Sequence, residues 1–230
     1  MIKISKRFQI LKNQINNIKY SYKDAIKSIK NLATAKFLES IEAHINLNIN
    51  PKYINQQIRS SIILPYGTGN KRKIAVITDN VSEAFLWGAD IAGTENIYNQ
   101  ISQGIINFDV LLTTPQYMPN LFKFSKFLGP KGLMPSLKSG TIATNLELLI
   151  KEFKQGKLEY RTDKSGIIHI IFGKANFLES ELEDNLLNIY YSIEKNKPFG
   201  IKGKFFKSFF ICTTMSPSIC IDLNSFHKKL

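Results

Sequence analysis

The apolar residues of this chain follow two different periods, and the change between them restricts the fold more than any other feature. From Glu39 to Asn50 apolar and polar residues alternate, which predicts a strand with one buried face. The runs Lys73–Thr78 and Phe108–Thr113 are nearly all apolar, as in strands that are buried on both faces. From Lys157 onward the alternation returns. Segments typical of an antiparallel sheet therefore flank segments typical of a parallel one.

Helical spacing accompanies both kinds of strand. Ser21 with Asp24 three residues later forms a capping box, a common start of a helix. The predicted helices cover Ser5–Lys19, Ser21–Leu32, Val81–Gly88, Thr94–Gly104, Thr144–Gln155 and Ser180–Glu194. The other predicted strands are Ile58–Leu64, Lys157–Arg161, Ile167–Phe172, Phe205–Thr213 and Ile219–Asp222. The turn signal Asp163–Gly166 predicts that Lys157–Arg161 and Ile167–Phe172 form a hairpin.

These elements predict an α/β protein with two domains. A terminal α+β domain, an antiparallel sheet with helices, takes residues 1–66 and 158–230 from both chain ends. A Rossmann-like parallel α/β domain of residues 67–157 is inserted into it, because strands and helices alternate there. The 230 residues are enough for two hydrophobic cores.

The charge of the chain indicates a polyanionic partner. The formal net charge is +13, and so much charge of one sign repels itself unless a partner neutralises it. Lys71 to Glu159 holds ten basic and eight acidic residues, a net charge of +2, which leaves +11 for the two ends. We therefore expect nucleic acid to contact chiefly the terminal domain.

Other classes of function find little support in the sequence. No apolar run is long enough to cross a bilayer, and the N-terminal residues lack the apolar region of a secretory signal. The two cysteines, Cys212 and Cys220, imply neither a disulfide framework nor a metal site. The three histidines, His44, His169 and His227, stand far apart without a paired Asp or Cys pattern. We expect no catalytic residues, no metal and no cofactor.

A nucleotide-dependent enzyme that uses the Rossmann-like domain is the alternative. Gly67-Thr68-Gly69 with Lys71 resembles part of a phosphate-binding loop. Such a loop follows a strand and opens a helix, whereas here a strand follows it. This context disfavours the enzyme, and a turn between the two domains explains the glycines.

The stretch Phe127–Thr141 predicts an ordered loop. Pro130 and Pro135 remove backbone donors and bias the preceding residues away from helix, so neither a helix nor a strand can run through it. Large apolar residues, among them Leu128 and Leu133, alternate with lysines. A merely solvated loop would rarely hold so many, so we expect this loop to pack its own apolar side chains.

This loop also resembles the signature of one family, the first protein of the large ribosomal subunit, the "L-one" protein of the lateral stalk. Further similar segments follow in order along nearly the whole chain. They are Ala35–Ser40, Leu64–Gly69, Asn107–Val110, Tyr160–His169, Phe172–Lys174 and Thr213–Met215. The resemblance implies the same two-domain fold and a structural, non-enzymatic role in translation as a ribonucleoprotein component of the large ribosomal subunit.

The resemblance places the RNA-binding surface on the terminal domain, in agreement with the charge. The RNA-binding positions that it implies are Lys36, Phe37, Ser40, Lys164, Lys174, Ser208, Thr214, Met215 and Ser216. Hydroxyls would reach phosphate and 2′-OH groups, while Phe37 and Met215 would contact nucleotides. The alternative for Phe37 and Met215 is that they are ordinary core residues. The chain departs from the family at Ser216, Tyr66 and Leu137, which stand for a usual glycine, histidine and proline.

The partners follow from the same resemblance. They are the stalk region of large-subunit rRNA and the exit-site tRNA, whose release accompanies movement of the stalk. Many bacterial members also act as repressors of their own messenger RNA, so that RNA is a further candidate partner. We expect a monomer within the ribosome, away from membranes, in the cytoplasm of a bacterium or in an organelle that encodes it.

Overall fold

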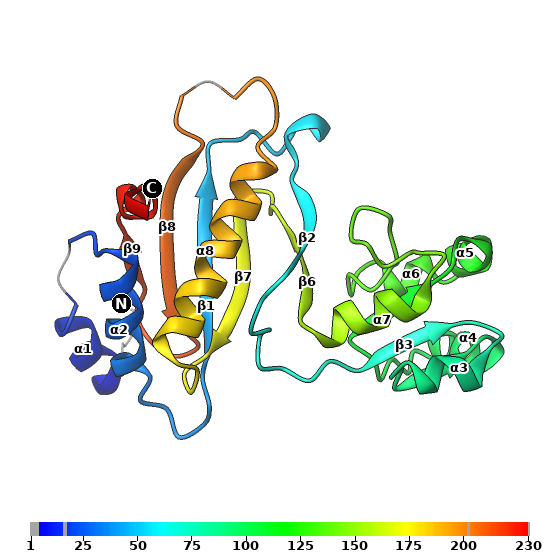
Figure 1. Ribbon diagram of the computed structural model, residues 1–230. Helices are drawn as coiled ribbons and strands as arrows, with labels where there is room; N and C mark the ends of the chain where they lie inside the picture. The colour runs from blue at the N-terminus through cyan, green and yellow to red at the C-terminus, as the bar shows by residue number, and fades with distance from the viewer. Residues whose placement is uncertain (1–4, 16–17, 202, 230) are drawn as a thin grey trace. The chain divides into compact units, whose positions relative to one another are not determined.

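The computed structural model describes residues 5–15, 18–201 and 203–229. The chain forms two compact units, one from the residues up to Gly69 together with those from Tyr160 onward, and the other from Asn70–Glu159 (Figure 1). Within the described residues, none of the helices combines the length and apolar character needed to span a bilayer.

The first unit is built on a four-stranded antiparallel sheet with the order β7-β1-β8-β9. The strands are β1 (Ser40–Leu47), β7 (Ile167–Lys174), β8 (Phe206–Thr213) and β9 (Ile219–Ile221). Two strands that follow β1 by more than a hundred residues therefore lie on either side of it. The sheet joins the two ends of the chain, which explains how one unit can contain both.

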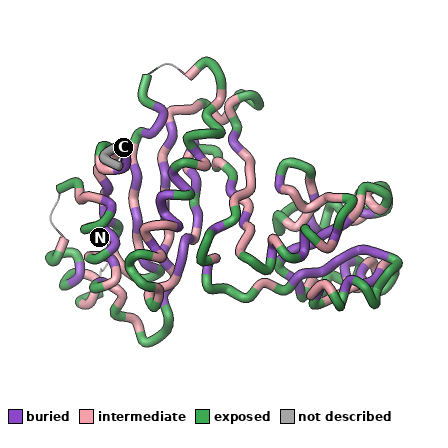
Figure 2. Tube along the Cα trace, in the orientation of Figure 1, coloured by how far each residue is buried: buried purple, intermediate pink, exposed green. Residues whose placement is uncertain are grey.

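The alternation of apolar and polar residues decides which face of this sheet is buried. In β1 the side chains of Ile41, Ala43, Ile45 and Leu47 are fully buried, and the residues between them are partly exposed. Helices α2 (Tyr22–Leu32) and α8 (Glu179–Lys195) pack against each other, with α2 contacting β8 and β9, and α8 contacting β7. Figure 2 shows the buried residues running along these strands and helices.

The opposite face of the sheet, here called the outer face, carries partly exposed residues. They are Glu42, His44 and Asn46 of β1, His169 of β7, and Ser208, Phe210 and Cys212 of β8. Every second residue of a strand points to the same face, so all of these share one surface.

The N-terminal helices begin where the sequence predicts. Helix α1 spans Lys6–Asn13, so the predicted continuation to Lys19 is wrong: Gln14 ends the helix, and residues 15, 18 and 19 are not helical. Residues 16 and 17 lie outside the described residues. Ser21 is confirmed as the N-cap of α2, because its Oγ accepts a hydrogen bond from the Asp24 backbone. The Asp24 carboxylate accepts from the Ser21 hydroxyl and not from the Ser21 backbone N–H that a capping box uses.

The predicted hairpin of Lys157–Arg161 with Ile167–Phe172 forms only at its turn, and the predicted pairing of the two strands is wrong. Strand β6 (Lys157–Arg161) pairs instead with β2 (Arg59–Ile63) in a two-stranded sheet, while β7 pairs with β1. The turn itself forms, since Asp163 accepts bonds from the backbone of Ser165 and Ile167. The turn signal fixes only the reversal of the chain. After one antiparallel bridge, between Thr162 and Ile168, β6 leaves the edge of β7 and pairs with β2.

The second unit contains a three-stranded parallel sheet with the order β4-β3-β5. The strands are β3 (Ile74–Ile77), β4 (Ile91–Gly93) and β5 (Val110–Thr113). The helices of this unit are α3 (Val81–Leu86), α4 (Glu95–Ser102), α5 (Met118–Phe122), α6 (Ser125–Leu128) and α7 (Leu146–Lys154). This unit also contains the 3-10 segment η2 (Pro115–Tyr117). The 3-10 segments η1 (Ile54–Gln56) and η3 (Leu223–Lys229) belong to the first unit.

Both faces of the parallel sheet are covered, as the continuous apolar runs predict. Ile74 and Val76 of β3 pack against α7, whereas Ala75 and Ile77 pack on the other side with Ile97 of α4. The two-domain α/β fold is thereby confirmed. One detail differs. Thr144 with Glu147 three residues later suggests a capping box, but Asn145 caps α7, its side chain accepting the bond from the Leu148 backbone.

The loop Phe127–Thr141 is ordered, as predicted, although its first two residues belong to α6. Leu128 is fully buried, and Leu133 and Met134 pack on the same core as α4. The hydroxyls of Ser136, Ser139 and Thr141 bond to one another, which fixes the second half of the loop.

Candidate nucleic-acid interface

The segment before β1 and the turn after β8 meet at one end of the sheet, and a buried carboxylate joins them. The side chain of Glu39 is 1% exposed. Its Oε1 accepts a hydrogen bond of 2.9 Å from the Ala35 backbone. Its Oε2 accepts 2.6 Å from Thr213 Oγ1 and 2.9 Å from the Met215 backbone. The side chain of Glu39 therefore ties the loop before Ser40 to the turn after Thr213. We call this region the junction.

The charge of Glu39 is stabilised despite its burial. Burial by itself raises the pKa of this carboxyl, but the bonds from Thr213, Ala35 and Met215 and the nearby charge of Arg7 lower it. The net effect is a pKa below the ordinary value, so Glu39 is ionised at neutral pH.

Two further contacts strengthen the junction. Thr214 Oγ1 accepts a bond of 3.1 Å from the Ser40 backbone, and the Thr214 backbone donates to Ser40 O. From α1, the Arg7 guanidinium donates to Met215 O at 3.0 Å. The sequence alone does not indicate that Arg7 belongs to this site, because Arg7 and Met215 are far apart along the chain.

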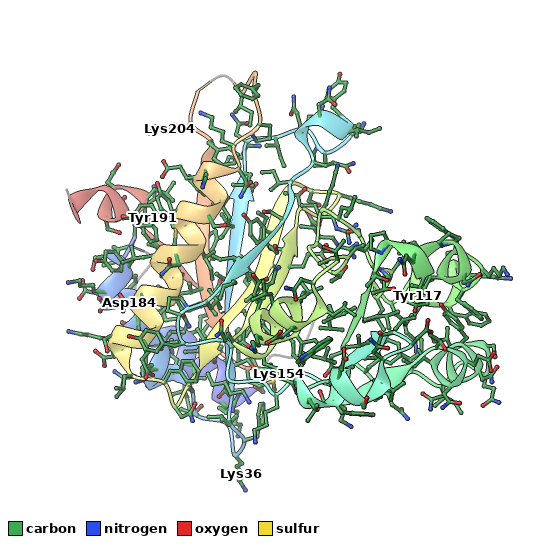
Figure 3. All side chains as sticks on the ribbon, turned by 45° about the vertical axis from the view of Figure 1, so that its right-hand side comes forward. Lys36, Tyr117, Lys154, Asp184, Tyr191 and Lys204 are labelled. Atoms are coloured by element: carbon green, nitrogen blue, oxygen red, sulfur yellow. The ribbon has the colours of Figure 1, made fainter. Side chains whose placement is uncertain are left out.

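The side chains exposed at this end of the sheet are those expected of an RNA contact. Phe37 is 55% exposed and Met215 50%, so the alternative that they are core residues is excluded. Lys36 is exposed as well, and Figure 3 shows its side chain extending outward from the tip of the loop. Lys174 lies at the same end of the sheet, since it pairs with Ser40. Exposed aromatic and basic groups are thus gathered around one rigid junction.

Two of the expected site residues lie elsewhere. Ser208 pairs with Asn46, six residues along β1 from Ser40, which is about 20 Å at the usual rise of a strand. Lys164 lies in the turn before β7, whose Gly166 bonds to Leu47 at that same far end. Ser208 lies on the outer face of β8, and this strand leads to the junction. Lys164 lies outside β8.

Serine replaces the family's usual glycine at position 216 without backbone strain. Among the described residues, none but glycine has a positive φ. Ser216 Oγ accepts a bond from the Thr213 backbone and donates to Pro217 O. The hydroxyl is therefore used to close the turn.

The expectation that the histidines stand apart is wrong for His44 and His169. The two residues are direct partners in adjacent strands, with their Nδ1 atoms 2.8 Å apart. His44 Nε2 lies 3.1 Å from Cys212 Sγ and 3.8 Å from Glu42 Oε2. The separation of these residues along the chain concealed the cluster, since only the order of the strands brings them together.

The Rossmann-like unit offers little to the nucleotide alternative. A cavity of about 410 Å³ lies near the carboxyl ends of its strands, and its lining includes Asp79, Glu95, Tyr98, Tyr117 and Lys123. Two carboxylates against one lysine would repel the phosphates of a nucleotide. The glycines at Gly67 and Gly69 lie in a turn that leads to β3 and opens no helix.

Comparison with known proteins gives a consistent result over almost the full length. Residues 29–217 match the Ribosomal protein L1p/L10e family. The "Large ribosomal subunit protein uL1c" of Trieres chinensis is 51% identical over 98% of this chain and 100% of its own. The protein of the same name from Guillardia theta is 50% identical over 100% and 99%. The "Large ribosomal subunit protein uL1" of Prochlorococcus marinus (strain NATL1A) is 52% identical over 97% and 96%.

Proposed function

The chain belongs to the Ribosomal protein L1p/L10e family, and from this premise we propose that it binds the stalk region of large-subunit rRNA through the end of the sheet around Glu39. As a large-subunit ribosomal protein it works in translation, in a ribosome of a bacterium or an organelle. The proposed contact surface consists of Lys36, Phe37, Ser40, Lys174, Thr214, Met215 and Ser216, extended along β8 to Ser208. Lys164 is proposed as a separate phosphate contact.

One observation carries this proposal. Three hydrogen bonds to Glu39 hold together the two chain segments that bear the exposed side chains of Phe37 and Met215. A surface that attracts RNA by charge alone needs only mobile lysines. Here Phe37 and Met215 are presented on a rigid junction, which suits contact with the bases or sugars of a folded RNA. The net charge of +11 outside Lys71–Glu159 supplies the attraction for phosphate.

Two further roles belong to the same proposal. A stalk protein of this kind would contact the exit-site tRNA as it leaves, and the same RNA-binding surface would let the free protein bind its own messenger RNA and repress its translation. Neither role requires an enzyme, and the acidic lining of the cavity in the Rossmann-like unit gives no support to a nucleotide-dependent one.

Substitution of Phe37 tests the surface most directly. Phe37→Ala removes an exposed ring and so leaves the fold intact, while loss of stacking on a base costs about 1–3 kcal/mol, or roughly tenfold or more in affinity. The measurement is a titration of a stalk-region RNA fragment with the wild type and the variant. Phe199→Ala is the matched control, because Phe199 is fully exposed in the loop at the other end of the sheet. Equal losses in both variants, or none in Phe37→Ala, would remove this surface from the proposal.

Substitution of Lys36 separates charge from contact. If its ammonium group neutralises a phosphate, Lys36→Gln lowers the slope of log affinity against log salt by about one, whereas Phe37→Ala leaves that slope unchanged. Salt titrations of the three proteins check this. Thr214 is less suitable for such a test, because its hydroxyl also accepts the bond from the Ser40 backbone. An unchanged slope in Lys36→Gln would place Lys36 outside the phosphate contact.

A further inference from the structure

The outer face of the sheet holds a second group of chemically active side chains between Ser40 and Ser208. Glu42 and Cys212 are direct partners across β1 and β8, and His44 stands two residues further along β1. One ligand atom from each of the three, a carboxylate oxygen, an imidazole nitrogen and a thiol sulfur, lies within 4.8 Å of the others. We propose that Glu42, His44 and Cys212 form a binding site for a zinc ion in the free protein.

The separations of the three ligand atoms suit a small cation. Zinc lies about 2.0–2.1 Å from nitrogen and 2.3 Å from sulfur, so at a tetrahedral angle these two ligands are about 3.5 Å apart. The observed distances are 3.1 Å from His44 Nε2 to Cys212 Sγ and 3.8 Å from His44 Nε2 to Glu42 Oε2. The Glu42 oxygen and the Cys212 sulfur lie within 4.8 Å of each other, so side-chain shifts of up to about 1 Å would complete the geometry. The sheet holds the backbones in register.

The side chains around His44 fix its ring orientation and tautomer in a way that suits a metal ligand. Its Nδ1 lies 2.8 Å from Nδ1 of His169, and Nε2 of His169 lies 3.7 Å from Asp163 Oδ2. With the proton of His169 on Nε2, toward Asp163, its Nδ1 accepts the bond that His44 Nδ1 donates. The lone pair of His44 Nε2 then points toward Cys212. A metal-bound histidine usually donates its other nitrogen to such a partner, which fixes the ring and its tautomer.

The chemistry of the set selects the class of metal. Thiolate and imidazole are ligands for zinc and its neighbours, whereas magnesium and calcium require oxygen ligands. On binding, the ion takes the place of the thiol proton between Sγ and His44 Nε2, and that proton passes to the buffer. Three protein ligands leave a fourth position for water, and the side chains of Glu42 and His44, 34% and 28% exposed, leave a path from solvent. RNA bound along β8 would cover this position, so the site belongs to the free protein.

Cobalt provides the test, because it replaces zinc and reports its ligands by absorption. We expect that titrating Co²⁺ into chelator-treated protein produces a thiolate-to-cobalt band in the near ultraviolet with visible bands of a tetrahedral ion, and that Zn²⁺ abolishes both. Cys212→Ser should remove the thiolate band. Cys220→Ser, the matched control in the neighbouring strand, should retain it in full.

Further variants separate the ligands from the positioning residue. His44→Gln should weaken cobalt binding more than tenfold, and His169→Phe should weaken it by roughly 10–100-fold while the thiolate band keeps its position. Circular dichroism confirms that each variant is folded. Wild-type protein without a thiolate band, or a band that survives in Cys212→Ser or is lost in Cys220→Ser, would overturn the proposal.

Discussion

Replacing Glu39 with glutamine is expected to lower the free energy of unfolding by about 1–3 kcal/mol and to weaken binding of a stalk-region RNA about tenfold. The amide keeps the shape of the side chain, but its NH₂ group must face one of three donors that now bond to the carboxylate. If the amide oxygen keeps Thr213 and Met215, the Ala35 backbone N–H is left without a partner. The segments that carry Phe37 and Met215 are then no longer held together.

The measurements for Glu39→Gln are urea unfolding and RNA titration under one set of conditions. Glu194→Gln makes the same change of charge at an exposed position in α8, so its unfolding free energy should stay within about 0.5 kcal/mol of wild type. If Glu39→Gln lost stability but bound RNA as tightly as wild type, the junction would be structural only. That outcome would remove Glu39 from the account of the RNA site.

The effect of Glu39 should also depend on pH. Its pKa in the folded protein lies below the ordinary value of 4.5, so its carboxylate stabilises the fold above that value and loses this contribution as the pH falls through the lowered pKa. Glutamine does not titrate, and the difference in unfolding free energy between wild type and variant should therefore shrink in acid. Unfolding curves at pH 7 and below 4 check the direction. A difference that grew toward low pH would contradict it.

Asn185→Leu is expected to reduce the free energy of unfolding by about 2–4 kcal/mol, the second large effect. The Asn185 amide is fully buried in α8 and donates to Phe172 O at 2.8 Å and to Gly67 O at 3.0 Å. It also accepts a bond from the Tyr66 backbone. Leucine fills a similar volume but leaves the carbonyl groups of Phe172 and Gly67 and the N–H of Tyr66 without this partner. The Phe172 carbonyl is buried.

A neighbouring residue of the same type provides the control for Asn185. Asn188→Leu makes the same substitution one turn along α8 at an exposed position and should change stability by less than about 0.5 kcal/mol. RNA affinity of folded Asn185→Leu should equal that of wild type, because this side chain touches neither Phe37 nor Met215. Equal stability of the two variants would show that the buried amide contributes nothing.

Together the two variants distinguish stability from recognition. Glu39 and Asn185 are both buried polar side chains that hold chain segments distant in sequence, but only Glu39 holds the proposed RNA surface. Stability should fall in both variants and RNA affinity in only one. A single measurement of thermal stability could not separate these roles.

Much of the fold was predictable because local patterns carry it. The alternation Ile41-x-Ala43-x-Ile45 requires a half-buried strand, and the apolar run at Ile74–Ile77 requires one covered on both faces. The order of these patterns along the chain was enough to predict two domains with one formed from both ends. The resemblance to the ribosomal family also depends on local motifs, and these motifs include Phe37 and Met215, whose side chains are exposed.

The sequence by itself determined the periods, the turns and the surplus of positive charge, because each depends on residues close together in the chain. Tertiary structure alone decided that β7 pairs with β1 and that β6 pairs with β2, since backbone hydrogen bonds do not choose a partner and burial does. It also decided that Glu39 bonds to Thr213 and Met215 and that His44 meets His169 and Cys212. These contacts join residues more than a hundred positions apart, and no local pattern records which of them the order of the strands will bring together.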